Sequence, residues 1–368
     1  MDPTTVASHP PAPPELNPPQ PGPHASEPDP FSLSVQDLQQ GLDPEFDESG
    51  WVEETNPAPQ GGFRRLLWKL SGGRYRPAPT ALEQQSRQLL ANTRRPFTGA
   101  RTVAVVSTKG GVGKTTTTLN LGHTLASIRG DRVVALDANP DAGSLGYRVE
   151  RQTTKTAADL LALGDPITSY SQVRPFTSQA TSRLEVIASP DDPHLTRRMG
   201  RKDYEDVLTM LGMQYNLILA DCGTGILDSA TRGVVQHADQ LVVVTGPSVD
   251  AARAVTYLLS WLAEHGMEEK VNRAIVVVNG VRPGRRPVDV DRICDHFDQL
   301  VRRVVTIPWD EELANGATVQ MEWLATQTRH AYLNLASSLI DEFVAEEETD
   351  PGGSTPIAIH TAQHGGNQ

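Results

Sequence analysis

The chain has 368 residues, of which 38% are hydrophobic, and a net charge of −12. This is enough apolar material for one large domain or two small ones. No apolar run reaches the roughly 18 residues of a membrane span, and the first residues lack the basic and apolar regions of a signal peptide, so we expect a cytoplasmic protein without a transmembrane segment. Two cysteines, Cys222 and Cys294, exclude a disulfide framework and lack metal-site spacing.

Residues 1–60 are acidic and rich in proline. They contain eleven Asp or Glu, no Lys or Arg, and fourteen of the 28 prolines. Such a segment cannot bury enough apolar surface to offset the entropy of ordering, which predicts a disordered arm. Composition favours a solvated leader over a partner-binding arm in which residues 31–43 form a helix on contact.

Residues 61–101 are basic and form a predicted linker. They contain nine Lys or Arg against the single acid Glu83, and the stretch GFRRLLWKL at 62–70 is amphipathic at helical spacing. This stretch can meet an acidic lipid surface, a nucleic-acid backbone or an acidic partner, or it can dock on the neighbouring domain or on the acidic arm. Two turns give at most a weak peripheral membrane contact.

From Thr102 onward, short β-branched runs alternate with helical stretches. Continuous apolar strands of this kind predict an α/β, doubly wound, mostly parallel seven-stranded sheet with helices on both faces, over residues 102–344. Residues 345–368 are predicted to be a disordered acidic tail. The predicted strands are 102–107, 132–138, 183–189, 216–221, 240–245, 274–279 and 303–308.

The first predicted strand runs directly into STKGGVGKTTTT, residues 107–118. Its glycines let backbone N–H groups converge on a phosphate at the start of a helix, and Lys114 can reach the terminal phosphates. The hydroxyl of Thr115 can hold Mg²⁺. A chance glycine-rich turn is the alternative, but strand, loop, GKT and helix occur in the order that a phosphate loop requires.

The standard phosphate loop has glycine at the position of Thr108, which here is followed by Lys109. The sequence KGGVGKTT resembles the deviant Walker A loop of the MinD/ParA family of ATPases. The resemblance implies a P-loop fold, ATP and Mg²⁺ as ligands, and a homodimer in the ATP-bound state. It also implies that Lys109 reaches across a nucleotide-sandwich dimer to the phosphates of the other subunit.

Two further motifs follow the family order. DANPD, residues 137–141, resembles switch I, which implies that Asp137 is an outer-shell Mg²⁺ partner. Asn139 occupies the place of the carboxylate that orients the attacking water, and an amide cannot accept a proton. Asp141 is either a substitute for that carboxylate or, as the loop context favours, a plain turn residue. DCGTG at 221–225 resembles Walker B with switch II, which implies that Asp221 orients magnesium-bound water and Gly225 senses the γ-phosphate.

Asn279, Pro308 and Asp310 follow the last two predicted strands, where the family holds adenine, although an Asn at a strand end is also a common turn residue. The lack of a guanine-reading N/TKxD motif favours ATP over GTP. The predicted site therefore has three groups: catalytic Lys109, Lys114, Asp137 and Asn139; nucleotide-binding Lys109, Gly110, Gly111, Val112, Gly113, Lys114, Thr115, Thr116, Gly225, Asn279, Pro308 and Asp310; and metal-binding Thr115, Asp137 and Asp221.

The sequence around these motifs, including GDRV at 130–133 and DANPD, is similar to that of the EspI-like, MinD-type ATPases associated with ESX (type VII) secretion in actinobacteria. The resemblance implies an ATP-driven switch that serves secretion, with a machinery partner bound through the acidic arm or the basic linker. The first alternative is ParA-like DNA partitioning; nonspecific DNA binding is less favoured because the domain is nearly neutral. The second is an ATP-gated scaffold with very slow hydrolysis, which Asn139 keeps open.

Overall fold

The computed structural model describes residues 81–140, 143–164, 167–189, 199–225, 228–284 and 288–349. The predicted acidic arm, the amphipathic stretch at 62–70, the tail beyond residue 349 and Asp141 lie outside these ranges. Among the helices that the structure describes, none is both long and apolar enough to cross a bilayer.

One eight-stranded sheet forms the centre of the domain, with the strand order β3-β4-β2-β5-β1-β6-β7-β8. All seven predicted strands are present and pair in parallel, because each is a short apolar run that can be buried on both faces. A two-residue strand, β3, was not expected and adds an antiparallel edge. The strands are β1 Arg101–Val106, β2 Val133–Ala138, β3 Ser178–Gln179, β4 Glu185–Ile187, β5 Leu217–Cys222, β6 Gln240–Thr245, β7 Ile275–Val281 and β8 Arg303–Pro308.

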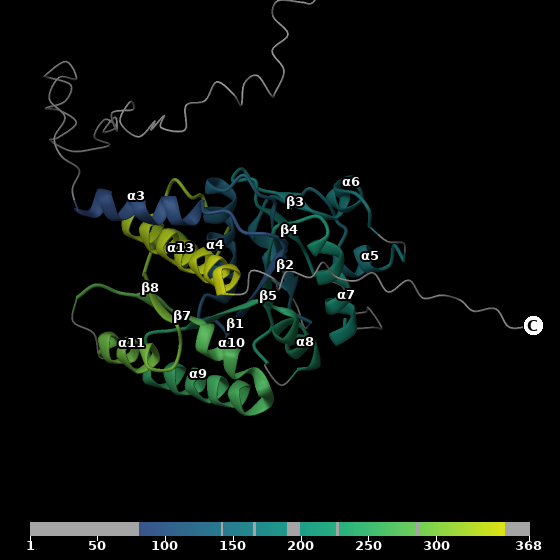
Figure 1. Cartoon of the computed structure of the whole chain (residues 1–368). Helices are drawn as coiled ribbons and strands as arrows, with labels where there is room; N and C mark the ends of the chain where they lie inside the picture. Colours follow the sequence, from purple (N-terminus) through teal and green to yellow (C-terminus); the bar gives the residue numbers. More distant parts are fainter. Residues whose placement is uncertain are drawn as a thin grey trace, which may run out of the picture. The chain divides into compact units, whose positions relative to one another are not determined.

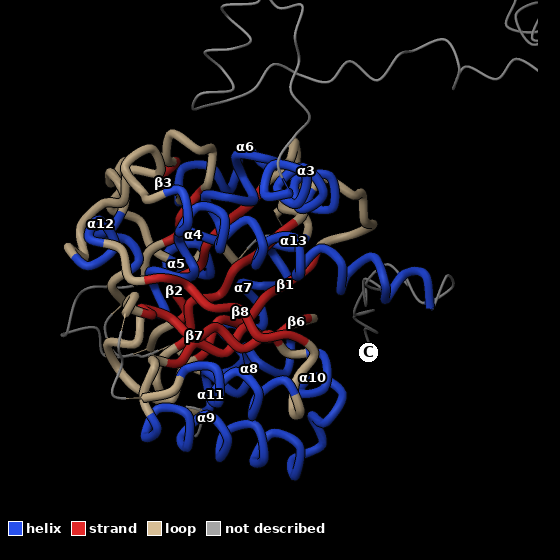
Figure 2. The backbone as a smooth tube through the Cα atoms, turned by 90° about the vertical axis from the view of Figure 1, so that its left-hand side faces the viewer, coloured by secondary structure: helices blue, strands red, loops and turns tan. Residues whose placement is uncertain are grey.

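Helices cover both faces of the sheet, as the doubly wound pattern predicts (Figures 1 and 2). Helices α4 and α13 pack on one face, and α5 and α7 to α11 pack on the other. The helices are α3 Ala81–Thr93, α4 Lys114–Ile128, α5 Ala157–Leu161, α6 Tyr170–Val173, α7 Arg201–Gly212, α8 Ser229–His237, α9 Val249–Leu262, α10 Glu268–Arg273, α11 Val290–Asp298, α12 Glu311–Ala314 and α13 Thr326–Thr349, with 3₁₀ turns η2 Leu145–Arg148 and η3 Arg174–Phe176 and a π turn η4 Ala263–Met267.

Successive residues of a central strand point to opposite faces, so each strand contributes to two separate cores. In β1, Val103 and Val105 pack with α4 and α13, whereas Ala104 and Val106 pack toward the other layer. All four are at most 1% exposed. The period-two alternation therefore fixes β1 at the centre of the domain, and the residues that follow Val106 emerge at the carboxyl edge of the sheet, where ligands of such folds bind.

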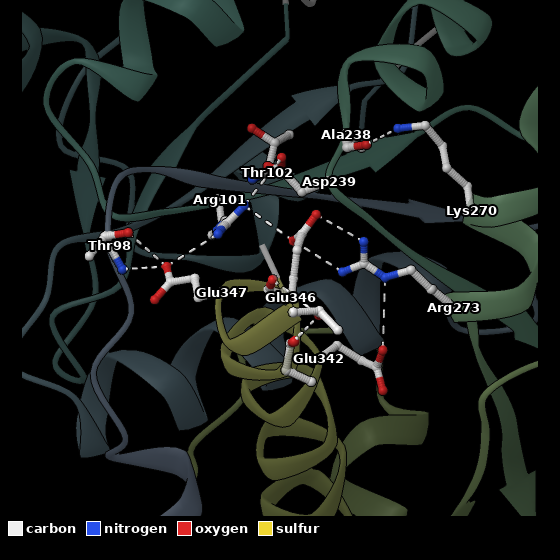
Figure 3. Close-up of polar contacts among 12 residues, drawn as sticks. Thr98, Arg101, Thr102, Ala238, Asp239, Lys270, Arg273, Glu342, Glu346 and Glu347 are labelled. Atoms are coloured by element: carbon white, nitrogen blue, oxygen red, sulfur yellow. Dashed lines mark hydrogen bonds and ion pairs between the residues drawn. The ribbon is translucent and has the colours of Figure 1, made fainter. Parts of the chain in front are cut away.

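A polar seam joins the start of β1 to the last turns of α13 (Figure 3). Arg273 donates to both carboxylate oxygens of Glu346, at 2.9 and 3.1 Å, and Arg101 donates to Glu346 and Glu347, each at 3.2 Å. The Thr98 N–H also donates to Glu347, at 2.6 Å. We call these five residues the α13 seam. It lies at the end of β1 opposite the glycine loop.

Two elements extend beyond the boundaries expected from the sequence. Helix α13 continues past Val344 to Thr349, because the acidic residues of its last turns have arginine partners in the seam. Helix α3 lies in the part of the chain expected to be a linker, and it packs along α13. Arg95, just after α3, pairs with Asp341 at 3.4 Å and Glu348 at 2.9 Å.

Candidate functional site

The loop between β1 and α4 is shaped by glycines in the left-handed region. Gly111 has a φ of 75° and Gly113 has a φ of 91°, values that residues other than glycine rarely adopt. A Cβ atom at Gly113 would lie 2.0 Å from Nδ2 of Asn279, so the close approach of β7 also requires glycine there. Gly113 caps α4 without a side-chain hydrogen bond. The first N–H groups of α4 have no partner within the helix and face the loop, which suits an anion.

Lys114, Thr115 and Asp221 lie together at the start of α4. The Lys114 ammonium contacts Oδ1 of Asp221 at 2.6 Å, and the Thr115 hydroxyl donates to Oδ2 at 2.6 Å. The lysine and aspartate side chains are only 9% and 2% exposed. Asp221 is near the end of β5, which pairs directly with β1. The sheet thus brings together two motifs that are more than 100 residues apart, as the sequence predicts for a phosphate loop and a Walker B strand.

Asp137 lies beside Asp221, because β2 and β5 place the two residues in register. Its carboxylate accepts hydrogen bonds from the Leu145 N–H at 3.0 Å and the Asn139 N–H at 3.2 Å. Burial, and then the charge of Asp221, raise the pKa of Asp137 to about 7, despite these donors. Two buried carboxylates side by side repel each other, so the pair favours either a proton or a cation.

Next to the glycine loop is a cavity of about 440 Å³. The Nδ2 group of Asn279 donates to the Val112 carbonyl at 2.8 Å and so ties β7 to the loop. The carboxylate of Asp310 caps α12 by accepting from the Glu312 N–H, and it also accepts, at 3.0 Å, from the N–H of Ala325, just before α13. The cavity is lined by Gly110, Gly111, Val112, Gly113, Thr116, Arg148, Gly246, Pro247, Asn279, Gly280, Pro308, Trp309, Asp310, Leu313, Ala314 and Gly316.

Lys109 does not line this cavity, and its side chain reaches α9. Its ammonium forms an ion pair with Asp250, in the first turn of that helix, and both side chains are exposed, 40% and 77%. The Lys109 hydrogen bond lowers the pKa of Asp250. Exposed pairs of this kind contribute little to stability, so Lys109 can leave Asp250 readily. Gly225 is exposed, and its carbonyl accepts from the Asp228 N–H at 3.0 Å.

The matched family agrees with this geometry. A profile of the CobQ/CobB/MinD/ParA nucleotide binding domain matches residues 103–321, more than half of the chain. The chain belongs to this family. The match begins in β1 and includes the glycine loop, Asp137, Asp221 and the cavity.

Two named relatives are similar in sequence to this MinD/ParA-family chain over part of its length. EspI, an ESX-1 secretion-associated protein of Mycobacterium tuberculosis, is 40% identical over 263 residues, 71% of this chain and 39% of EspI. The chain thus spans about two fifths of that relative's length. MinD, a septum site-determining protein of Synechocystis, is 29% identical over 65% of this chain and 89% of that protein.

Solved structures confirm the fold. The ParA family ATPase from Chlorobium tepidum superposes with a TM-score of 0.56 at 23% identity, over 65% of this chain and 98% of that one. The cell division ATPase MinD from Pyrococcus furiosus gives 0.54 at 21% identity, over 66% and 99%. At these identities the likeness establishes the doubly wound P-loop architecture.

Arg148 and Trp309 are among the cavity residues that the sequence did not predict. Arg148 donates to the Thr116 hydroxyl at 2.9 Å, and Trp309 has the Arg282 guanidinium over its ring at 4.5 Å. Arg148 follows the switch I segment without any local motif, so only the fold brings it to the loop. Trp309 lies between the predicted residues Pro308 and Asp310, and this position in the sequence could have indicated that it lines the cavity.

Proposed function

We propose that this chain binds ATP with Mg²⁺, hydrolyses it and alternates between a free state and an ATP-sandwich homodimer. The observation that carries the proposal is the cluster of Lys114, Thr115 and Asp221 at the start of α4, beside a cavity that continues to Asn279 and Asp310. One end of this arrangement suits phosphates and the other has room for a base. This extent matches a nucleotide better than a free phosphate.

The residues at the loop fit a magnesium ion. Mg²⁺ prefers oxygen ligands and retains several waters, and Thr115 and Asp221 present a hydroxyl and a carboxylate to one point. Asp137 adds a second carboxylate, in register with the first and able to hold a metal-bound water. When bound, the ion supplies positive charge to the phosphates, and its charge offsets the repulsion between Asp137 and Asp221.

Different side chains of this protein have separate roles in the proposed hydrolysis. Lys114 balances charge on the terminal phosphates, and the N–H groups at the start of α4 hold them in place. Asn139 can hold the attacking water through its amide but cannot take its proton. Lys109 acts on the partner subunit's nucleotide after leaving Asp250. The deficit at Asn139 makes slow turnover the expected behaviour of an isolated chain.

The biological setting follows from similarity. The name of EspI describes it as an ESX-1 secretion-associated protein, and EspI is 40% identical over 71% of this chain. We therefore propose that the switch is a cytoplasmic accessory or regulator of type VII secretion. Residues 1–80, which precede α3, are the part of the chain that we propose contacts a secretion partner.

Replacing Lys114 tests the nucleotide site. Lys114→Ala removes the ammonium that balances phosphate charge, so calorimetry should show at least a 100-fold loss of affinity for ADP and ATP. Lys202→Ala is the matched control, because this lysine is 82% exposed and forms an ion pair with its helix neighbour Asp206. Circular dichroism should confirm that both variants fold. Retained affinity in a folded Lys114→Ala protein would contradict the assignment.

A further inference from the structure

Arg148 ends the turn η2 and reaches the beginning of α4. Its Nη1 donates to the Thr116 hydroxyl at 2.9 Å. A Cβ atom built on Gly316 would lie 3.8 Å from its Nη2, so the guanidinium extends from the first turn of α4 to the loop after α12. The side chain is half-buried and forms part of the cavity wall. Within the described part of the chain, the hydrogen bond to the neutral Thr116 hydroxyl thus positions this charged group beside the glycine loop.

The charge of Arg148 distinguishes it from the other cations near the loop. Lys114 pairs with Asp221 and Lys109 pairs with Asp250. Among the described residues, no carboxylate forms an ion pair with Arg148, and no other lysine or arginine lines the cavity. A guanidinium presents five donors in a planar fork that matches phosphate oxygens. An unpaired, partly desolvated arginine at a cavity wall is therefore suited to a phosphate group.

The position of Arg148 in the cavity indicates which phosphate of a bound nucleotide it would contact. Lys114 and Thr115 turn toward Asp221, on the side of the sheet that suits the terminal phosphates and the ion. Asn279 and Asp310 line the cavity, whereas Lys114 and Thr115 do not. In a nucleotide the α-phosphate connects the nucleoside to the terminal phosphates, so it must pass between these two groups of residues. Thr116 directly follows Thr115 and lines the cavity, and Arg148 donates to its hydroxyl, so these two residues are the candidates for the α-phosphate contact.

We propose that Arg148 binds the α-phosphate of the nucleotide and thereby fixes the nucleoside end of the ligand in the cavity. The proposal rests on the nucleotide binding proposed above. Because ADP and ATP share the α-phosphate, Arg148 holds the ligand equally before and after hydrolysis. It is a binding and positioning residue, and it differs in this respect from Lys109 and Lys114, which act on the terminal phosphates.

The test compares affinities for ADP and for the non-hydrolysable analogue AMP-PNP, each with Mg²⁺, by calorimetry on the full chain. Arg148→Ala should weaken both ligands by about tenfold and by the same factor. Arg148→Lys keeps the charge without the fork and should lose less. Arg151→Ala is the matched control, because Arg151 is an exposed arginine of the same segment that donates to the Thr153 carbonyl at 3.0 Å. It should bind both ligands like the wild type.

An α-thio analogue locates the contact. In adenosine 5′-O-(1-thiodiphosphate) a sulfur replaces one α-phosphoryl oxygen, so Arg148→Ala should weaken at least one diastereomer by a smaller factor than it weakens ADP. An equal loss for ADP and both diastereomers would overturn the α-phosphate contact. So would unchanged affinities, or a loss confined to AMP-PNP.

The controls separate this inference from the proposed function. If the wild type binds neither nucleotide, the proposed function fails. If the wild type binds both and the folded Arg148 variants bind equally well, only the role of Arg148 fails. Thermal melts of each variant establish that it is folded; if Arg148→Ala is not, the fold change in Arg148→Lys decides.

Discussion

At the scale of single residues, Asn139 stands where the resemblance of DANPD to switch I implies a carboxylate. Its backbone N–H donates to Asp137 at 3.2 Å, and a Cβ atom at Gly223 would lie 3.2 Å from its Oδ1. The amide thus lies between the switch I segment and the segment that follows β5. This is a suitable place to hold a water molecule, but the group present cannot accept a proton.

Asn139→Asp should raise ATP turnover by about tenfold or more, because a carboxylate can both orient the water and take its proton. Steady-state phosphate release at saturating ATP and Mg²⁺ measures the effect. Asn315→Asp, in the turn that follows α12, is a control for the added charge. An unchanged or lower rate would show that another group handles the water, and it would favour an ATP-gated scaffold that hydrolyses very slowly.

Residues with a fixed place in a motif could be predicted from the sequence, and residues brought in by the fold could not. Lys114, Asp137 and Asp221 follow strands in the family order, and parallel pairing brings them to one edge of the sheet. Arg148 is 32 positions from its partner Thr116 and has no motif of its own. Asp310 does line the cavity, but its carboxylate caps a helix, a role that a strand-end position alone did not reveal.

At the scale of elements, the helix α13 shows how distant charges set a boundary. Its last turns contain a run of glutamates, a composition that predicts a disordered tail. The partners Arg101 and Arg273 are 245 and 73 residues away, and they offset the repulsion within that run. The strands, in contrast, could be predicted, because a strand that is buried on both faces appears in the sequence as a short, continuous apolar run.

The α13 seam should be sensitive to acid. The hydrogen bond from Arg273 lowers the pKa of Glu346, so its stabilisation is present above the ordinary glutamate value and is lost as pH falls through the lower folded value. Glu346→Gln should lower the free energy of unfolding at pH 7 by up to about 1 kcal/mol, with a Tm lower by roughly 2–4 °C. The difference should shrink once the pH falls below the ordinary glutamate value and should vanish below the lowered pKa of folded Glu346.

Urea unfolding at pH 7, 5 and 4 measures this difference. Glu348→Gln is the matched control, because that carboxylate is 68% exposed and contacts Arg95 at 2.9 Å near the surface. It should behave like the wild type at each pH. A Glu346→Gln effect of the same size at pH 4 and pH 7 would show that the loss comes from packing and not from the charge.

At the scale of the whole molecule, the two halves of the sheet contribute different parts of the site. Strands β2 and β5 supply Asp137 and Asp221, and strands β7 and β8 lead to Asn279 and Asp310, with β1 between the halves. A nucleotide bound along the cavity would contact both halves. The ion pair of Lys109 with Asp250 adds a third element, α9, that could exchange an internal contact for one with a second copy.

Lys109→Ala should spare ADP binding to within about threefold while abolishing the dimer, because the ammonium is proposed to reach the partner subunit's phosphates. Analytical ultracentrifugation with ATP and Mg²⁺ checks the mass. Asp250→Asn serves as the control, since it removes the internal partner of Lys109 and should leave the dimer intact. An undisturbed dimer in Lys109→Ala would contradict action in trans. Chelation of Mg²⁺ should return the wild type to a monomer.

Strand β1 begins in the α13 seam and ends at the glycine loop. Its six residues span roughly 20 Å. Arg101 at one end is hydrogen-bonded to the helix against which α3 packs, and Val106 at the other end is followed directly by the loop. The strand is therefore a short, buried connection between the segment that follows α3 and the proposed phosphate site. A displacement of α3 would therefore be transmitted to that site through the backbone of β1.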